Sequence, residues 1–273
     1  MSGDESFAIL QELIVAQKAG DPVVLATIVK ARGSVPRHVG TKMLVYADGR
    51  MSGTIGGGEM EARVIDMAQT VLAADEAQTL PYALIDPKRG DPGVCGGEVE
   101  IFMEPYLPPA TVYVIGCGHV GRAVAHLAHW LGYRTVVTDD RVALASAENI
   151  PNAHVYLPGP INDALAKHPI HSNTFVVVVT RNVMVDREIL PQLVKTPTPF
   201  IGVMGSRRRW ETTRGLLLQD GVLEADLSRF HSPLGLELNA ESPEEIAVSI
   251  LSEIIMLRRK GTGERMAKGK GEK

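Results

Sequence analysis

The chain has 273 residues and a formal net charge of −4 at pH 7, with 45% hydrophobic and 22% charged residues. This composition excludes a wholly disordered chain, and no apolar run reaches the roughly 18 residues of a membrane span. Two cysteines exclude a disulfide scaffold, and the acidic first residues lack the basic start of a secretory signal, so we expect a cytoplasmic protein. The length favours two domains.

Residues 1–104 predict a small mixed α/β domain. A helix capped by Ser6 is expected to end near Gly20, because glycine commonly follows the last helical turn. Apolar, β-branched runs bounded by turn residues predict strands, and Asp48-Gly49 is typical of a hairpin turn. The other elements expected in this domain are strands at 23–29, 42–46, 51–55, 82–85 and 98–104 and a helix at 59–74.

Residues 105–110 predict a proline-rich linker, because three prolines in six residues fit neither a helix nor a central strand. Residues 111–259 then alternate between expected strands and helices, which is typical of a doubly wound parallel sheet. The elements expected there are strands at 111–115, 134–138 and 175–179 and helices at 119–131 and 244–257. We expect residues 260–273 to be a disordered, basic tail.

The second domain carries a glycine-rich turn of the dinucleotide-binding type. Its three glycines are Gly116, Gly118 and Gly121. The first makes the tight turn, the second lets a pyrophosphate approach the backbone, and the third packs the helix on the strand. Asp139 or Asp140 ends the next strand and could bind a ribose, and Arg141 could bind a 2′-phosphate. We expect a Rossmann-like domain that binds NAD(P) or another nucleotide; the alternative is a turn kept for packing. Cys117, between the glycines, is expected to be a small filler rather than a reactive thiol.

Three loops of the first domain combine glycines with groups that could bind a ligand. Consecutive glycines leave backbone N–H groups open for an oxyanion, and arginine adds positive charge. Cys95 lies in the third loop, where such surroundings would lower the pKa of its thiol and favour a soft metal. The alternatives are tight turns and a small buried cysteine. The candidate residues are Arg37, Gly56, Gly57, Gly58, Cys95, Gly96 and Gly97.

Five segments together resemble the XdhC/CoxI family of accessory proteins for xanthine dehydrogenase and related molybdenum hydroxylases. Each segment alone is a modest signal, but their number and order are specific. The segments are 25–65, GVCGGEVEIFMEP at 93–105, VIGCGHVGRAVA with VVTDDR at 114–141, IGVMGSRRR at 201–209 and HSPLGLELNAESPEEIAVSILSEII at 231–255.

The resemblance implies a chaperone of purine catabolism without turnover of its own. Such proteins bind the molybdenum cofactor, protect it while a cysteine desulfurase supplies its sulfido ligand, and insert it into the apo-hydroxylase. By resemblance Cys95 would contact the cofactor and its metal, and Arg37 with the Gly56–Gly58 loop would support its phosphate or pterin. A homodimer is left open. The net negative charge of the chain outside its basic tail argues against nucleic-acid binding.

The chain also departs from the family pattern. Glu59 follows the triple glycine where some relatives have a cysteine, which leaves one expected metal thiolate. Residues 180–183 read Thr-Arg-Asn-Val where many relatives are rich in His and Asp, which weakens a metal site in the second domain. The alternative functions are an NAD(P)-dependent oxidoreductase and a redox-sensing module that uses Cys95 and Cys117.

Overall fold

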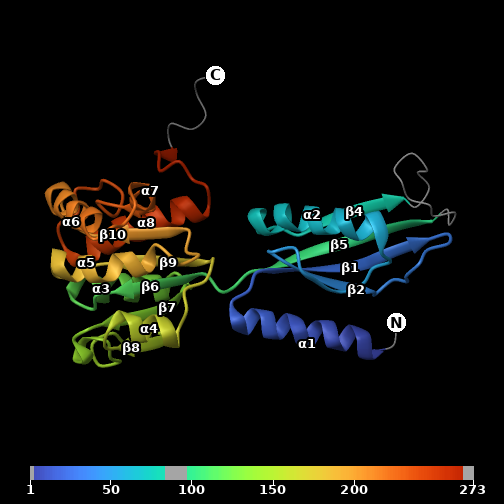
Figure 1. Ribbon diagram of the computed structural model, residues 1–273, viewed down its shortest axis with the longest axis horizontal. Helices are drawn as coiled ribbons and strands as arrows, with labels where there is room; N and C mark the ends of the chain where they lie inside the picture. Colours follow the sequence, from blue (N-terminus) through green and yellow to red (C-terminus); the bar gives the residue numbers. More distant parts are fainter. Residues whose placement is uncertain (1–2, 84–96, 267–273) are drawn as a thin grey trace, which may run out of the picture. The chain divides into compact units, whose positions relative to one another are not determined.

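The computed structural model describes residues 3–83 and 97–266 (Figure 1). It divides into two compact units, Met1–Pro108 and Pro109–Lys273. Two of the candidate residues, Cys95 and Gly96, lie outside the described residues. In the part of the chain that is described, no helix is long and apolar enough to cross a membrane.

Unit 1 is an antiparallel five-stranded sheet with one helix packed on each face. Successive side chains of a strand point to opposite faces, so β1 contributes to both cores. Val24, Ala26 and Ile28 pack on the side of α2, whereas Val23 and Leu25 pack on the side of α1. The elements are α1 (Gly3–Ala19), β1 (Val23–Arg32), β2 (Lys42–Tyr46), β3 (Met51–Gly53), α2 (Gly58–Ala74), β4 (Gln78–Ala83) and β5 (Glu98–Tyr106), with strand order β3-β2-β1-β5-β4.

Strand β5 extends into the segment that the sequence predicts as a linker. Pro105 pairs with Val24 and Tyr106 with Val23 of β1. The other neighbour, β4, begins only opposite Met103. Beyond Met103, β5 is therefore an edge on the β4 side, and proline is tolerated there because no hydrogen bond from its nitrogen is needed.

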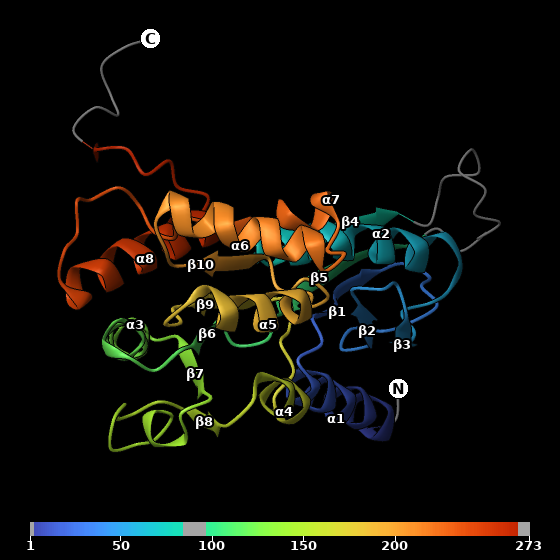
Figure 2. The ribbon, with the colours of Figure 1, turned by 60° about the vertical axis from the view of Figure 1, so that its left-hand side comes forward.

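Unit 2 is a six-stranded parallel sheet of the doubly wound type, which confirms the predicted fold class. The strand order is β11-β10-β9-β6-β7-β8, and the direction of winding reverses between β6 and β9. In Figure 2 the labelled strands β8, β7, β6, β9 and β10 follow one another from bottom to top. The strands are β6 (Thr111–Ile115), β7 (Arg134–Asp139), β8 (Val155–Pro158), β9 (Thr174–Val178), β10 (Phe200–Val203) and β11 (Phe230–His231).

Helices cover both faces of this sheet. Alternate residues of β9 enter the two cores, with Phe175 and Val177 in one and Val176 and Val178 in the other. Helix α8 begins with a capping box formed by Ser242 and Glu245, as expected of an N-terminus with proline in its first turn. The helices are α3 (His119–Trp130), a 3₁₀ turn (Val142–Leu144), α4 (Ile161–Lys167), α5 (Val183–Leu193), α6 (Arg207–Gln219), α7 (Glu224–Leu227) and α8 (Pro243–Arg258).

Candidate functional site

The described parts of the three predicted loops of unit 1 lie against one another. A Cβ atom placed on Gly97 would lie 2.3 Å from the carbonyl oxygen of Ser34. A Cβ atom on Gly56 would lie 2.7 Å from Cγ of Pro36. The Arg32–Arg37 loop therefore packs against both the triple glycine and the residue that precedes β5, and larger residues would force these loops apart.

The chain's own carboxylate occupies much of the triple-glycine turn. Oε1 of Glu61 accepts hydrogen bonds from the backbone N–H groups of Ile55 at 3.2 Å and Gly57 at 2.9 Å, and from the Thr54 hydroxyl. The N–H of Gly56 donates to Thr54 Oγ1 at 3.2 Å. Two of the three glycine amides predicted to be open are thus engaged, which leaves the exposed Gly58 for an external ligand.

A cavity of about 410 Å³ adjoins these loops. It combines acidic and basic side chains with one aromatic ring, and Lys30 forms an ion pair with Glu100 at its rim. The guanidinium of Arg63 lies 5.7 Å from the ring centroid of Tyr82. The lining residues are Lys30, Arg32, Glu59, Arg63, Pro81, Tyr82, Ala83, Glu98, Val99 and Glu100.

Two polar side chains near the loops have no partner within the described residues. Oε2 of Glu59 is buried and accepts no hydrogen bond. Arg37 is half-buried and forms no hydrogen bond or ion pair with another described residue. Among those residues no three His, Cys, Asp or Glu side chains gather where they could hold a metal ion. The predicted metal ligand Cys95 lies outside the described range.

The glycine turn of unit 2 has three geometrically different glycines. A Cβ atom on Gly116, whose φ is 106°, would lie 2.6 Å from the Val179 carbonyl oxygen. A Cβ atom on Gly121 would lie 1.8 Å from the Gly116 carbonyl oxygen. Gly118 has no atom within 4 Å of such a position and an ordinary φ of −72°. Packing therefore requires the first and third glycines, whereas Gly118 leaves space beside the N-terminus of α3.

Asp139, the expected ribose ligand, is fully engaged by hydrogen bonds within the chain. It is 4% exposed, and its Oδ2 accepts a hydrogen bond from the N–H of Cys117 at 2.7 Å. The side chain of Arg141 donates to both carboxylate oxygens at 2.9 Å, and its backbone N–H donates to Oδ1. A ribose hydroxyl would have to displace these donors.

Cys117 is a buried filler of this turn. Its side chain is 1% exposed, and its Sγ donates to the Thr138 carbonyl oxygen at 3.4 Å. Burial, with the nearby Asp139, raises the pKa of its thiol to about 12. A thiol with such a pKa is protonated at neutral pH, so Cys117 lacks the thiolate that redox chemistry requires.

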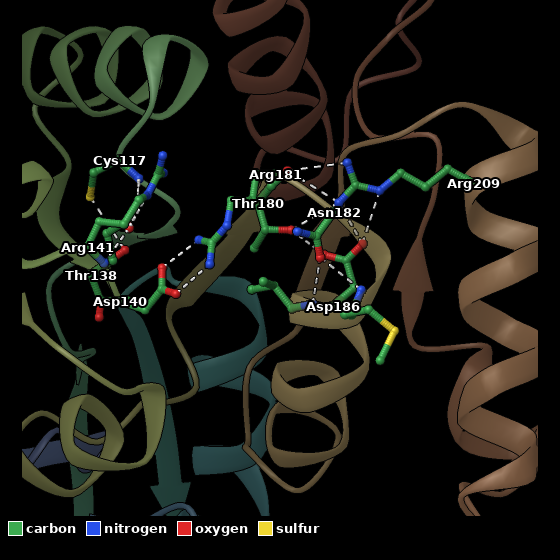
Figure 3. A network of polar contacts seen from close by, with 12 residues as sticks. Cys117, Thr138, Asp140, Arg141, Thr180, Arg181, Asn182, Asp186 and Arg209 are labelled. Atoms are coloured by element: carbon green, nitrogen blue, oxygen red, sulfur yellow. Dashed lines mark hydrogen bonds and ion pairs between the residues drawn. The ribbon is translucent and has the colours of Figure 1, made fainter.

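An ion pair lies at the carboxyl ends of the strands, near the point where the strand order reverses. Arg181, after β9, donates to both oxygens of Asp140, after β7, at 2.7 Å each (Figure 3). Hydrogen bonding to Arg181 lowers the pKa of Asp140 to about 2. Both side chains line a cavity of about 150 Å³ that also reaches Gly116 and Thr180. Crevices at such reversals are the usual ligand sites of doubly wound sheets.

Sequence reasoning missed a buried polar cluster beside this crevice. Asp186 of α5 is 0% exposed and accepts hydrogen bonds from Thr180 Oγ1 and from Arg209, whose Nη2 lies 2.6 Å and Nε 3.1 Å away. Arg209 also donates to the Thr180 carbonyl oxygen. The absence of a side chain at Gly205 makes room for Arg209, because a Cβ atom there would lie 2.8 Å from Arg209 Cδ. The GSRRR segment was the available signal, but it carried no predicted role.

Comparison with known proteins identifies the class. Residues 112–254 match the XdhC Rossmann domain, and residues 16–83 match the XdhC and CoxI family. The chain therefore belongs to the XdhC and CoxI family, as the sequence motifs predict.

One relative extends over nearly the whole chain and a second over somewhat more than half of it. YqeB of Escherichia coli (strain K12), an uncharacterized protein, is 33% identical over 95% of this chain and 48% of its own length. A probable xanthine dehydrogenase subunit of Bacillus subtilis (strain 168) is 31% identical over 59% of this chain and 46% of its own. This chain thus spans about half the length of these two relatives.

Two further matches cover both proteins more evenly. The molybdenum cofactor insertion chaperone PaoD of Escherichia coli (strain K12) is 22% identical over 93% of this chain and 89% of its own. A solved structure described as a xanthine dehydrogenase from Bacillus halodurans is 24% identical, with a TM-score of 0.50 over 94% of this chain and 97% of that one. At this identity the structural likeness supports the fold alone.

Proposed function

We propose that this protein is an accessory chaperone that binds the molybdenum cofactor, supports its sulfuration and inserts it into a xanthine dehydrogenase or a related molybdenum hydroxylase. The observation that carries the proposal is membership of the XdhC and CoxI family in both units. The similarity to PaoD, an insertion chaperone by name, supports the same role. The partners are the apo-hydroxylase and a cysteine desulfurase, and the setting is the cytoplasm.

The loops of unit 1 are the proposed cargo site. The cargo combines a pterin, a phosphate and a metal bound by sulfur, so it calls for donors to an anion and a soft ligand. Arg37 has a free guanidinium within the described residues, and Gly58 offers an exposed backbone in the same loop cluster. Cys95 is the proposed metal contact on the strength of the family motif.

The second candidate function is an NAD(P)-dependent oxidoreductase. The open space at Gly118 favours it, because a pyrophosphate could approach the N-terminus of α3 there. The engagement of Asp139 by Cys117 and Arg141 disfavours it, since the usual ribose acceptor is not free. The chaperone proposal does not depend on a nucleotide in unit 2.

The decisive experiment measures cargo and delivery. Protein purified without oxygen from cells that make molybdopterin should carry a pterin, detected by fluorescence after oxidation. Added to the apo-hydroxylase, it should restore activity in proportion to its amount, without multiple turnovers. Cys95→Ala should lose the cofactor, whereas Cys117→Ala, which changes the buried cysteine of the other unit, should keep it.

Two results would contradict the proposal. Equal cofactor content in Cys95→Ala and the unaltered protein would contradict the assignment of Cys95 to the cofactor site. Normal specific activity of the hydroxylase in cells lacking this protein would contradict the chaperone role. Absorbance changes of a nicotinamide with a small substrate would instead support the oxidoreductase.

A further inference from the structure

The cavity of unit 1 is lined by charged groups, of which Glu59 and Arg63 form no ion pair among the described residues. Lys30 and Glu100 neutralise each other at the rim. Glu59 and Arg63 both line the cavity and form no ion pair with each other. The cavity is about 410 Å³ in volume, within the range of roughly 300–1,000 Å³ typical of small-molecule sites.

Glu59 and Arg63 do not form the ion pair that their spacing on α2 favours. They lie four residues apart on α2 with the glutamate first, the arrangement that most favours an ion pair on a helix. Arg63 instead lies over the ring of Tyr82, and Oε2 of Glu59 is buried with no hydrogen-bond donor among the described residues. A buried carboxylate oxygen without a donor destabilises the protein, and a ligand that supplies the donor removes that cost.

The two side chains together define the chemistry of a complementary ligand. A carboxylate accepts hydrogen bonds from two adjacent N–H groups, and a neighbouring guanidinium donates to an oxygen. A flat heterocycle with two N–H donors beside a carbonyl matches this arrangement. The 2-amino-4-oxo edge of a pterin has that order of groups, and guanine shares it.

We propose that Glu59 and Arg63 bind the 2-amino-4-oxo edge of a pterin in this cavity. Glu59 accepts from the ring N–H and the 2-amino group, and Arg63 donates to the 4-oxo group. The choice of pterin over guanine rests on the proposed function, in which the cargo carries a pterin. Arg32 lines the same cavity and would supply positive charge for an anionic substituent of the ligand.

Matched small ligands test the proposal on the full chain. Lumazine-6-carboxylate has an oxo group in place of the 2-amino group of pterin-6-carboxylate. Only the pterin therefore offers both the ring N–H and the 2-amino group to Glu59. Isothermal titration should give at least a tenfold lower Kd for the pterin. Glu59→Gln should abolish this preference, because an amide presents one acceptor and one donor. Arg63→Met should weaken both ligands alike, because both have the 4-oxo group.

Asp66→Asn is the matched control, since Asp66 is an exposed carboxylate on the same helix, and it should keep the preference. Equal affinity for the two ligands, no binding of the pterin at millimolar concentration, or an unchanged preference in Glu59→Gln would overturn the proposal. GMP and IMP differ by the same amino group, so tight, amino-dependent binding of GMP with weak binding of the pterin would also overturn it.

The outcome is separable from that of the proposed function. Full delivery of cofactor by Glu59→Gln would overturn the pterin site and leave the chaperone role intact. A clear pterin preference together with normal hydroxylase activity in cells lacking the protein would support the pterin site and contradict the chaperone role.

Discussion

Replacing Arg209 with methionine tests whether the Thr180–Asp186–Arg209 cluster stabilises unit 2. The side chain of Asp186 is 1% exposed and that of Arg209 21% exposed. Methionine keeps much of the aliphatic packing but leaves a buried carboxylate whose one remaining side-chain donor among the described residues is the Thr180 hydroxyl. Breaking a buried ion pair by removing one partner costs about 3–5 kcal/mol. Because Arg209 is partly exposed, we expect a loss in the free energy of unfolding of about 3 kcal/mol.

Tryptophan fluorescence reports on this unit selectively. The chain has two tryptophans, and both Trp130 and Trp210 lie in unit 2. Trp130 is 76% exposed, so Trp130→Phe leaves Trp210, whose ring packs against Phe230 at 5.7 Å, as the reporter. Urea unfolding of Arg209→Met in this background gives the free-energy change directly.

Arg208→Met is the control, because Arg208 is the exposed neighbour on the same turn, where surface substitutions usually act within about 0.5 kcal/mol. Asp186→Asn should cost less than Arg209→Met, about 1–3 kcal/mol, since the remaining guanidinium can reach water. Unfolding of Arg209→Met and Arg208→Met at the same urea concentration would show that the cluster does not stabilise unit 2.

Two other predictions concern unit 2. Gly118→Ala should leave the unfolding midpoint unchanged, whereas Gly121→Ala should destabilise by about 1–3 kcal/mol, because only the second places a methyl group against a backbone oxygen; equal midpoints for the two variants would contradict this packing. Burial, with the nearby His168 and Arg134, lowers the pKa of His171 to about 4. The unfolded state therefore binds more protons between pH 6.5 and 4, and stability should fall as the pH decreases through this window. His171→Gln should make unfolding less pH-dependent there, and an unchanged pH profile would show that other groups dominate.

Elements with a long, regular pattern could be predicted from the sequence. The predicted strands at 42–46 and 111–115 agree with β2 and β6, because short, mainly apolar runs bounded by turn or loop residues define them. Strands β8, β10 and β11 have four, four and two residues, too few for any periodicity. Helix α1 begins at Gly3, ahead of the Ser6 expected to cap it.

The candidate sites were predictable only in part, because glycine positions are local but side-chain partners are not. The close approach at Gly116 and Gly121 follows from the turn motif itself. The hydrogen bonds from the Ile55 and Gly57 amides to Glu61, and the pairing of Asp186 with Arg209, depend on how the chain packs after it folds. For the same reason the sequence could not show that Asp139 is already engaged. The roles of Cys95 and Gly96 stay predictions.

The bond between Asp139 and the Cys117 amide has a consequence for ligand affinity. A loop that must become ordered around a ligand loses conformational entropy, and this loss weakens binding. In this turn the amide of Cys117 and the side chain of Arg141 already fix the backbone through a buried carboxylate. An anion arriving at the first turn of α3 would meet a rigid, preorganised loop, so its affinity would depend on its contacts rather than on any rearrangement of the chain.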